Sequence, residues 1–162
     1  MLPRVRMSAG VEWAVHCCVV LSQAQEPVPA QRLAEYHGVS RTYLAKHLQQ
    51  LARAGLVSST EGRVGGYRLT RPASEITVLD VVLAIEGDDP AFRCTEIRRN
   101  GPFPASDQQC RRPCGIARAM YAAEDVWRAS LTSVTVADLA EGVERDNGPR
   151  TFVRLRGWLA GA

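Results

Sequence analysis

The hydrophobic positions between Ala30 and Leu69 follow a helical period and then stop at a group of glycines. A first helix is predicted to begin at Ala30 and to end at Gly38. Ser40 then suits the N-cap of a second helix, because its hydroxyl can accept a backbone N–H. The apolar residues of this second helix recur at steps of four and three and predict one inward face: Leu44, Leu48 and Leu51.

Two short strands are predicted after Gly55, over Leu56–Ser59 and Tyr67–Thr70. A glycine-rich turn with Arg63 at its tip connects them. Helix, turn, helix and β-hairpin in this order define a winged helix-turn-helix. The predicted fold class is therefore mainly α with a small β-hairpin wing.

The outward face of the second helix carries hydrogen-bond donors and positive charge without a carboxylate. Such a helix fits the major groove of double-stranded DNA, and an arginine-tipped wing can reach phosphates or the minor groove. A protein–protein module on the same scaffold is the alternative, but this face has no apolar patch. We expect base or phosphate contacts from six residues: Ser40, Arg41, Thr42, Tyr43, Lys46 and Arg63.

The remaining hydrophobic pattern predicts helices over about 11–21, 74–86, 114–133 and 135–143. The long third one has an apolar stripe that we expect to pair with its copy in a homodimer: Ile116, Met120, Ala123, Trp127 and Leu131. We divide the chain into a DNA-binding domain (1–87), an irregular cysteine-bearing loop (88–113), a dimerisation helix with a following short helix (114–144) and a C-terminal tail (145–162). Phe152, Leu155 and Trp158 indicate that the tail is docked.

Charge is distributed unevenly along the 162 residues. Residues 1–71 hold nine Lys and Arg against four Asp and Glu, whereas the remainder holds 11 against 13. This asymmetry places a nucleic-acid surface in the basic front half. The longest apolar run, Trp13–Leu21, is too short to span a membrane, and nothing resembles a signal peptide. We therefore expect a soluble, cytoplasmic protein without a membrane partner.

Glu12 and His16 are the only strongly polar residues of the first predicted helix, and they lie four positions apart on one face. In so apolar a helix we expect both to be at least partly buried, where a carboxylate or an imidazole needs a partner. An ion pair between the two is the simplest partner.

The later cysteines, Cys94, Cys110 and Cys114, carry the chemical signal in a C-x15-C-x3-C spacing. An irregular loop can wrap an ion or a cluster, and Cys114 opens a predicted helix, where the dipole favours a thiolate. The spacing alone leaves metal ligands and free thiols equally open, with a Cys110–Cys114 disulfide as a further possibility under oxidation.

The run VSRTYLAKHLQQLARAGLVSSTEGRVGGYRLTRPASEITVLDVVLAIEG resembles the signature of the bacterial winged-helix regulators that include IscR and NsrR. The segments GVEWAVHCCVV, PAFRCTEIRRNGP and CGIARAM are similar to those of redox-sensing members of that family. The resemblance extends to about Val143. It implies a homodimeric transcriptional regulator, expected to be a repressor, that binds a palindromic or half-site operator.

The resemblance also implies a 2Fe–2S cluster shared across the dimer interface. Its ligands would be Glu12 and His16 of one copy with Cys94 and Cys114 of the other, and Cys110 in reserve. The cysteines are spaced more widely than in IscR-like members, which disfavours three cysteine ligands. Trp13 is expected to transmit a change in the positions of the cluster ligands to the second helix of the helix-turn-helix, which we call the reading helix. Packing in the core is an equal alternative for Trp13.

Three other functions are consistent with the same residues. A zinc site could use Cys94, Cys110, Cys114 and His16, or a thiol switch could join Cys110 to Cys114 without a metal. An iron–sulfur carrier would leave the basic helix face unexplained. We expect no enzyme and no small-molecule substrate, because His37 and His47 have no nucleophile beside them in the sequence and no phosphate-binding loop is present.

Overall fold

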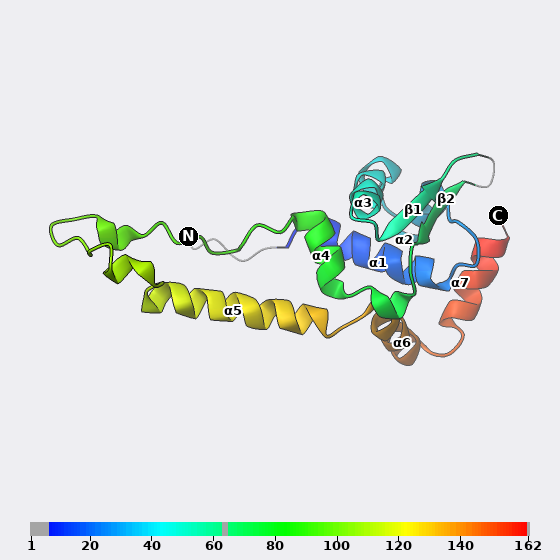
Figure 1. Cartoon of the computed structure of the whole chain (residues 1–162). Coiled ribbons are helices and arrows are strands. Elements are labelled where there is room, and N and C mark those ends of the chain that lie inside the picture. Colours follow the sequence, from blue (N-terminus) through cyan, green and yellow to red (C-terminus); the bar gives the residue numbers. More distant parts are fainter. Residues whose placement is uncertain (1–6, 63–64, 162) are drawn as a thin grey trace. The chain divides into compact units, whose positions relative to one another are not determined.

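A computed structural model describes residues 7–62 and 65–161 of the chain (Figure 1). Within these ranges the chain forms seven α-helices and one two-stranded antiparallel sheet. The helices are α1 (Ala9–Gln23), α2 (Ala30–His37), α3 (Arg41–Arg53), α4 (Val78–Glu86), α5 (Gly115–Thr132), α6 (Val136–Asn147) and α7 (Thr151–Ala160), and the strands are β1 (Val57–Thr60) and β2 (Gly66–Leu69). The predicted fold class is confirmed. No helix in the described ranges is both long and apolar enough to cross a membrane.

The chain divides into two compact units. Unit 1 comprises Met1–Gly87 and Leu131–Ala162, and unit 2 comprises Asp88–Ser130. Helix α1 is central to unit 1, where it contacts α3, α4, α6, α7 and β2. Figure 1 shows α3 and the hairpin on one side of α1 and α6 on the other. This central position explains why α1 is apolar nearly all round.

The helix-turn-helix forms as the sequence predicts. Gly38 ends α2 with a positive φ of 64°, a conformation that favours glycine. The Ser40 hydroxyl accepts the backbone N–H of Tyr43 at 3.5 Å and so caps α3. The inward leucines of α3 are buried, at 0–1 % exposed: Leu44, Leu48 and Leu51.

The β-hairpin is anchored to the linker between α1 and α2. Val57 pairs with Leu69 and Thr60 with Gly66, which sets the register of the two strands. Val28 and Tyr67 exchange two backbone hydrogen bonds of 2.8 Å, so the linker pairs with β2 through an isolated antiparallel β-bridge. The base of the wing is therefore fixed to the middle of unit 1.

Helix α4 begins later than predicted, at Val78 and not near Ser74. A short 3₁₀ turn occupies Ala73–Glu75, and Thr77 then caps α4 in a capping box with Asp80. Thr77 also forms a β-bridge with Thr135, which caps α6 in the same way. The start of α4 is thus set by pairing with a segment far along the chain.

The C-terminal segment is more ordered than its weak pattern suggests. Residues 151–160 form α7, and Phe152 and Leu155 are buried in the core of unit 1. Trp158 is partly buried. The docking predicted for this segment is confirmed, and it takes the form of a helix.

Unit 2 contains the irregular segment and nearly all of α5. Two 3₁₀ turns, Ile97–Arg99 and Gln109–Arg111, are the regular structure that it has before α5. Cys114 directly precedes α5, as predicted. The apolar stripe of α5 is largely uncovered in the single chain, with Ile116 73 % and Met120 43 % exposed.

Candidate nucleic-acid interface and cluster-ligand residues

The first residues of α3 present the face that the sequence predicts for DNA contact. All five described candidates are exposed: Ser40, Arg41, Thr42, Tyr43 and Lys46. Within the described part of the chain, neither Arg41 nor Lys46 forms an ion pair. Their charges are therefore available to phosphates. Arg63, the sixth candidate, lies outside the described residues.

An aromatic chain joins this face to α1. The ring of Trp13 meets the ring of Tyr43 edge-on, with centroids 4.9 Å apart. The ring of Tyr43 meets that of His47 at the same centroid distance. Such edge-to-face pairs are favourable and directional. The reading helix is thus in direct contact with the residue that follows Glu12.

His47 is the buried member of this group of aromatic rings, and no pattern in the sequence predicts a role for it. It is only 4 % exposed, and its Nδ1 lies 2.9 Å from the Gln50 side-chain oxygen. Gln50 in turn donates to the backbone oxygen of Ile85 in α4 at 3.2 Å. The ring rests on Gly10, where an added Cβ would lie 2.4 Å from His47 Cε1. His47 therefore fixes α3 against α1, and Gln50 extends the contact to α4.

Glu12 and His16 are exposed, contrary to our expectation of partial burial. No salt bridge joins them in the described part of the chain, so the expected ion pair is also wrong for the isolated chain. Both side chains line a cavity of about 180 Å³ together with Trp13, His37, Val39 and Leu44. This side of α1 faces an opening next to α2 and α3, so neither group needs the partner that burial would have required.

His37, at the end of α2, is a second histidine in this cavity. Its ring centroid lies 5.7 Å from that of His16. Burial, and then the neighbouring charge of His16, lowers the pKa of His37. Its Nε2 is buried and has no hydrogen-bond partner among the described residues. No local pattern predicts this contact, because the two histidines come from different helices.

In unit 2, Cys114 has the environment of a thiolate. Its sulfur accepts the backbone N–H of Ala117 at 3.4 Å. This hydrogen bond and another from Ile116, together with the positive charge of Arg98, lower the pKa of the thiol. Cys114 and Cys110 are partly buried, whereas Cys94 is exposed.

The described residues of one chain contain no group of three or more Cys, His, Asp or Glu side chains arranged to hold a metal ion. A Cys₃His zinc site is therefore not preformed within them. The donors occur as an exposed carboxylate and imidazole on α1 and as thiols in unit 2. Thiolate and imidazole are established ligands of 2Fe–2S clusters, so the donor types fit that group.

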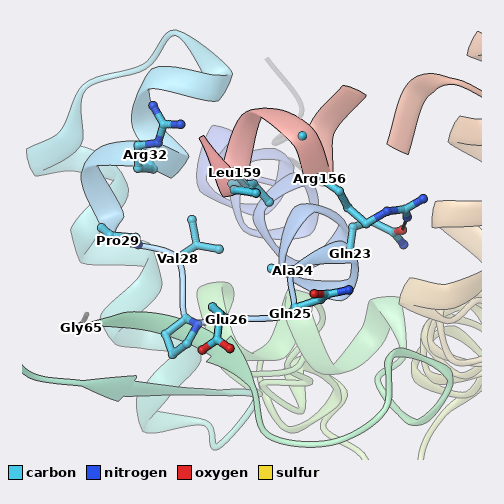
Figure 2. Close-up of a pocket in the computed structure, with 13 residues that line it drawn as sticks. Gln23, Ala24, Gln25, Glu26, Val28, Pro29, Arg32, Gly65, Arg156 and Leu159 are labelled. Atoms are coloured by element: carbon cyan, nitrogen blue, oxygen red, sulfur yellow. Dashed lines mark hydrogen bonds between the residues drawn. The ribbon is translucent and has the colours of Figure 1, made fainter. Parts of the chain in front are cut away.

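Another cavity of unit 1 lies at the base of the wing and measures about 730 Å³ (Figure 2). Val28 and Leu159 form part of its apolar wall. Figure 2 shows Arg32 and Arg156 extending away from Val28 at its rim. Arg32 stacks on the ring of Trp158 at 3.7 Å, and Arg156 donates to the side-chain oxygen of Gln23 at 3.0 Å. The two arginines thereby hold α7 to α2 and to the end of α1.

The winged helix-turn-helix and its exposed basic helix define the class of protein, a winged-helix transcriptional regulator. Residues 7–142 match the model of the Rrf2 family, described as an iron-dependent transcriptional regulator. The chain belongs to the Rrf2 family.

Individual relatives agree with this assignment. The chain is 34 % identical over 142 residues to Protein aau3 of Rhizobium meliloti, covering 85 % of this chain and 86 % of that protein. It is 41 % identical over 76 residues to the HTH-type transcriptional regulator IscR of Photorhabdus laumondii, covering 47 % and 46 %. The structure of CymR (YrzC), the global cysteine regulator of B. subtilis, superposes with a TM-score of 0.61 at 25 % identity, covering 87 % of this chain and 98 % of that one.

Proposed function

We propose that this chain is a homodimeric, cytoplasmic repressor of the redox-sensing RsrR type, whose affinity for a palindromic or half-site operator depends on the state of a 2Fe–2S cluster. The observation that carries this proposal is the contact between Trp13 and Tyr43. It links the helix that carries Glu12 and His16 to the helix that presents Lys46 to DNA. A sensor needs such a direct path between the sensing residues and the reading residues.

The proposed ligands are Glu12 and His16 of one copy and Cys94 and Cys114 of the other, with Cys110 in reserve. A bound 2Fe–2S cluster would supply reversible one-electron chemistry, at a potential that imidazole ligation raises relative to thiolates alone. Two observations support this ligand set. Glu12 and His16 are exposed on α1 and form no ion pair within the described residues, and hydrogen bonds stabilise Cys114 as a thiolate.

The residues of the chain then couple sensing to DNA binding. Glu12 and His16 lie on the exposed side of α1, and Trp13 lies between that side and Tyr43. A shift of either ligand side chain changes the space that Trp13 occupies in the cavity. Trp13 transmits this change to the first turn of α3, from which Thr42, Tyr43 and Lys46 are positioned for DNA. Arg41 and Ser40 are proposed to contact phosphates, and Arg63 would contact DNA from the wing.

The test is anaerobic purification followed by measurement of iron content, visible absorbance and the EPR spectrum after dithionite. Mobility shifts with fragments of the regulator's own promoter region, in the oxidised and the reduced state, measure the switch. We expect about two irons per chain and a change in DNA affinity between the states. A colourless protein that binds DNA equally well with oxidant and with reductant would contradict the proposal.

A thiol switch is a second candidate, because Cys110 and Cys114 are both free and partly buried, and Arg98 places a positive charge at the backbone of Gln109 and Arg112 beside them. Two thiols would lose two protons and two electrons to an added oxidant such as a disulfide reagent, with formation of a Cys110–Cys114 bond. Mass spectrometry of the iron-free protein under oxidant would then show a loss of two hydrogens. Retention of both thiols would exclude this candidate.

A further inference from the structure

Arg98 is the residue that holds together the cysteine-bearing segments of unit 2. Its guanidinium donates to the backbone oxygen of Gln109 at 3.2 Å and to that of Arg112 at 3.1 Å. These two oxygens lie on either side of Cys110 in the sequence. On the other side of the loop, the backbone of Arg98 itself lies four residues after Cys94. One side chain thus connects the segment that follows Cys94 to the segment around Cys110.

Glu96 completes the arrangement. Its carboxylate accepts hydrogen bonds from Nε and from one terminal nitrogen of Arg98, the latter at 2.8 Å. The backbone of Glu96 has a φ of 52°, and it is the only non-glycine residue with positive φ among the described residues. That conformation is unfavourable for an L-residue with a side chain. The two-point pair with Arg98 offsets this cost and fixes the direction of the guanidinium.

The backbone around Arg98 is hydrogen-bonded as well. Its carbonyl accepts the N–H of Ala105 at 2.8 Å, and Arg99 donates its N–H to the carbonyl of Glu96 at 3.0 Å. Arg98 is only about a quarter exposed, with 26 % of its side-chain surface accessible. Arg98 thus forms hydrogen bonds through both its side chain and its backbone, in a segment with little regular structure.

The charge of Arg98 also acts on the thiols. Its guanidinium is held at the backbone oxygens of Gln109 and Arg112, next to Cys110 and two residues before Cys114. A positive charge next to thiolate ligands favours the more negative, reduced form of any group that they hold. Arg98 therefore combines a mechanical and an electrostatic effect on the same cysteines.

We propose that Arg98 is a positioning residue that shapes the cysteine loop before a cluster is bound and stabilises the reduced state afterwards. The second part rests on the proposed function, because it requires the cysteines to be cluster ligands. The first part concerns the cluster-free chain and does not.

The test compares the full-length wild type with Arg98→Met, Arg98→Lys and Arg111→Met. Arg111 is an exposed arginine of the same loop next to Cys110. Its substitution removes one positive charge and leaves the hydrogen bonds of Arg98 in place. Hydrogen–deuterium exchange of the cluster-free proteins follows the amides of Arg99, Ala105 and Cys110, which are hydrogen-bonded in this loop. We expect exchange about tenfold faster in Arg98→Met and Arg98→Lys, and unchanged exchange in Arg111→Met and in unit 1.

The cluster-loaded proteins provide the second readout, a reductive titration followed by EPR. The midpoint potential is expected to fall in Arg98→Met and to stay near the wild-type value in Arg98→Lys, which keeps the charge. Loop exchange in Arg98→Met equal to that of Arg111→Met would overturn the mechanical part. A midpoint potential of Arg98→Met equal to that of the wild type would overturn the electrostatic part. A wild type that takes up no iron would instead contradict the proposed function. The exchange result would still decide whether Arg98 positions the cysteine loop.

Discussion

Trp13 connects α1 to α3 through the edge-on contact of its ring with that of Tyr43. We predict that Trp13→Ala removes the difference in DNA affinity between oxidised and reduced protein, because the contact with Tyr43 is lost. Trp13→Phe keeps an aromatic edge and should retain most of the difference. Mobility shifts in both redox states, with iron content as the control for cluster retention, measure this. An unchanged redox response in the alanine variant would assign Trp13 to packing alone.

Lys46 has a simpler role, that of an exposed cation on the reading face. Lys46→Ala should weaken DNA binding on all sequences and reduce the slope of log K against log salt by about one, since one phosphate contact is lost. Binding measured by fluorescence anisotropy at several salt concentrations gives this slope. Arg154→Ala removes the same charge from the exposed face of α7 and serves as the control. Equal slopes for the two variants would show that Lys46 does not contact a phosphate.

At the level of single residues, the sequence predicted exposure on α3 well and failed on α1. The reading face follows from helical period, because Leu44 and Leu48 fix which side points inward. The exposure of Glu12 and His16 depends on where α2 and α3 leave α1 uncovered, which no local pattern contains. His37 escaped attention for the same reason, because its neighbour His16 comes from another helix. Arg98 escaped attention because the loop that brings it to Gln109 and Arg112 follows no helical or strand period.

Gly10 shows how closely two helices approach in unit 1. Gly10→Ala places a methyl group against the His47 ring, where the Cβ would be 2.4 Å from Cε1. Overpacking of this kind costs about 1–3 kcal/mol and outweighs the gain of about 0.5–1 kcal/mol from helix propensity. We therefore predict a lower melting temperature and weaker DNA binding.

Gly142→Ala provides the control for this prediction, because Gly142 also lies within a helix but has no atom within 4 Å of the added Cβ. The melting temperature of this variant should rise slightly. A Gly10→Ala protein as stable as the wild type would mean that His47 moves aside at no cost.

Among the elements, capping and period located most helices, and tertiary pairing set the exceptions. The hydrophobic pattern predicts a start of α4 near Ser74, because a local pattern does not reveal that Thr77 pairs with Thr135. Helix α7 has only two fully buried apolar residues, Phe152 and Leu155, and its pattern is correspondingly weak. Its helical state depends on docking, including the stacking of Arg32 on Trp158.

At the scale of the whole molecule, the proposed ligand set predicts complementation between inactive variants. Glu12→Ala/His16→Ala lacks the α1 ligands, and Cys94→Ala/Cys114→Ala lacks the thiols. In a mixed dimer, one of the two sites regains all four ligands only if each site draws on both copies. Co-expression in equal amounts should then restore roughly a quarter of the wild-type iron, because half of the dimers are mixed and each has one intact site.

Differently tagged copies and purification through both tags isolate the mixed dimer and raise the expected content to about half. Each variant expressed alone provides the baseline. Iron at the baseline in the doubly purified sample would place all ligands on one copy, or on other residues. The exposed stripe of α5, including Ile116 and Met120, is our proposed surface for joining the copies.

The pairing of Val28 with Tyr67 has a consequence for how operators are distinguished. Both hydrogen bonds between them are short, and a Cβ on Gly66 would lie only 2.4 Å from the carbonyl carbon of Val28. The base of the hairpin is thus tightly joined to the linker that follows α1, and we expect the two to move together. A displacement of Val28 would then move the wing as a rigid body. We expect the proposed regulator to discriminate the spacing between half-sites through the angle of the wing and not through bending of the hairpin.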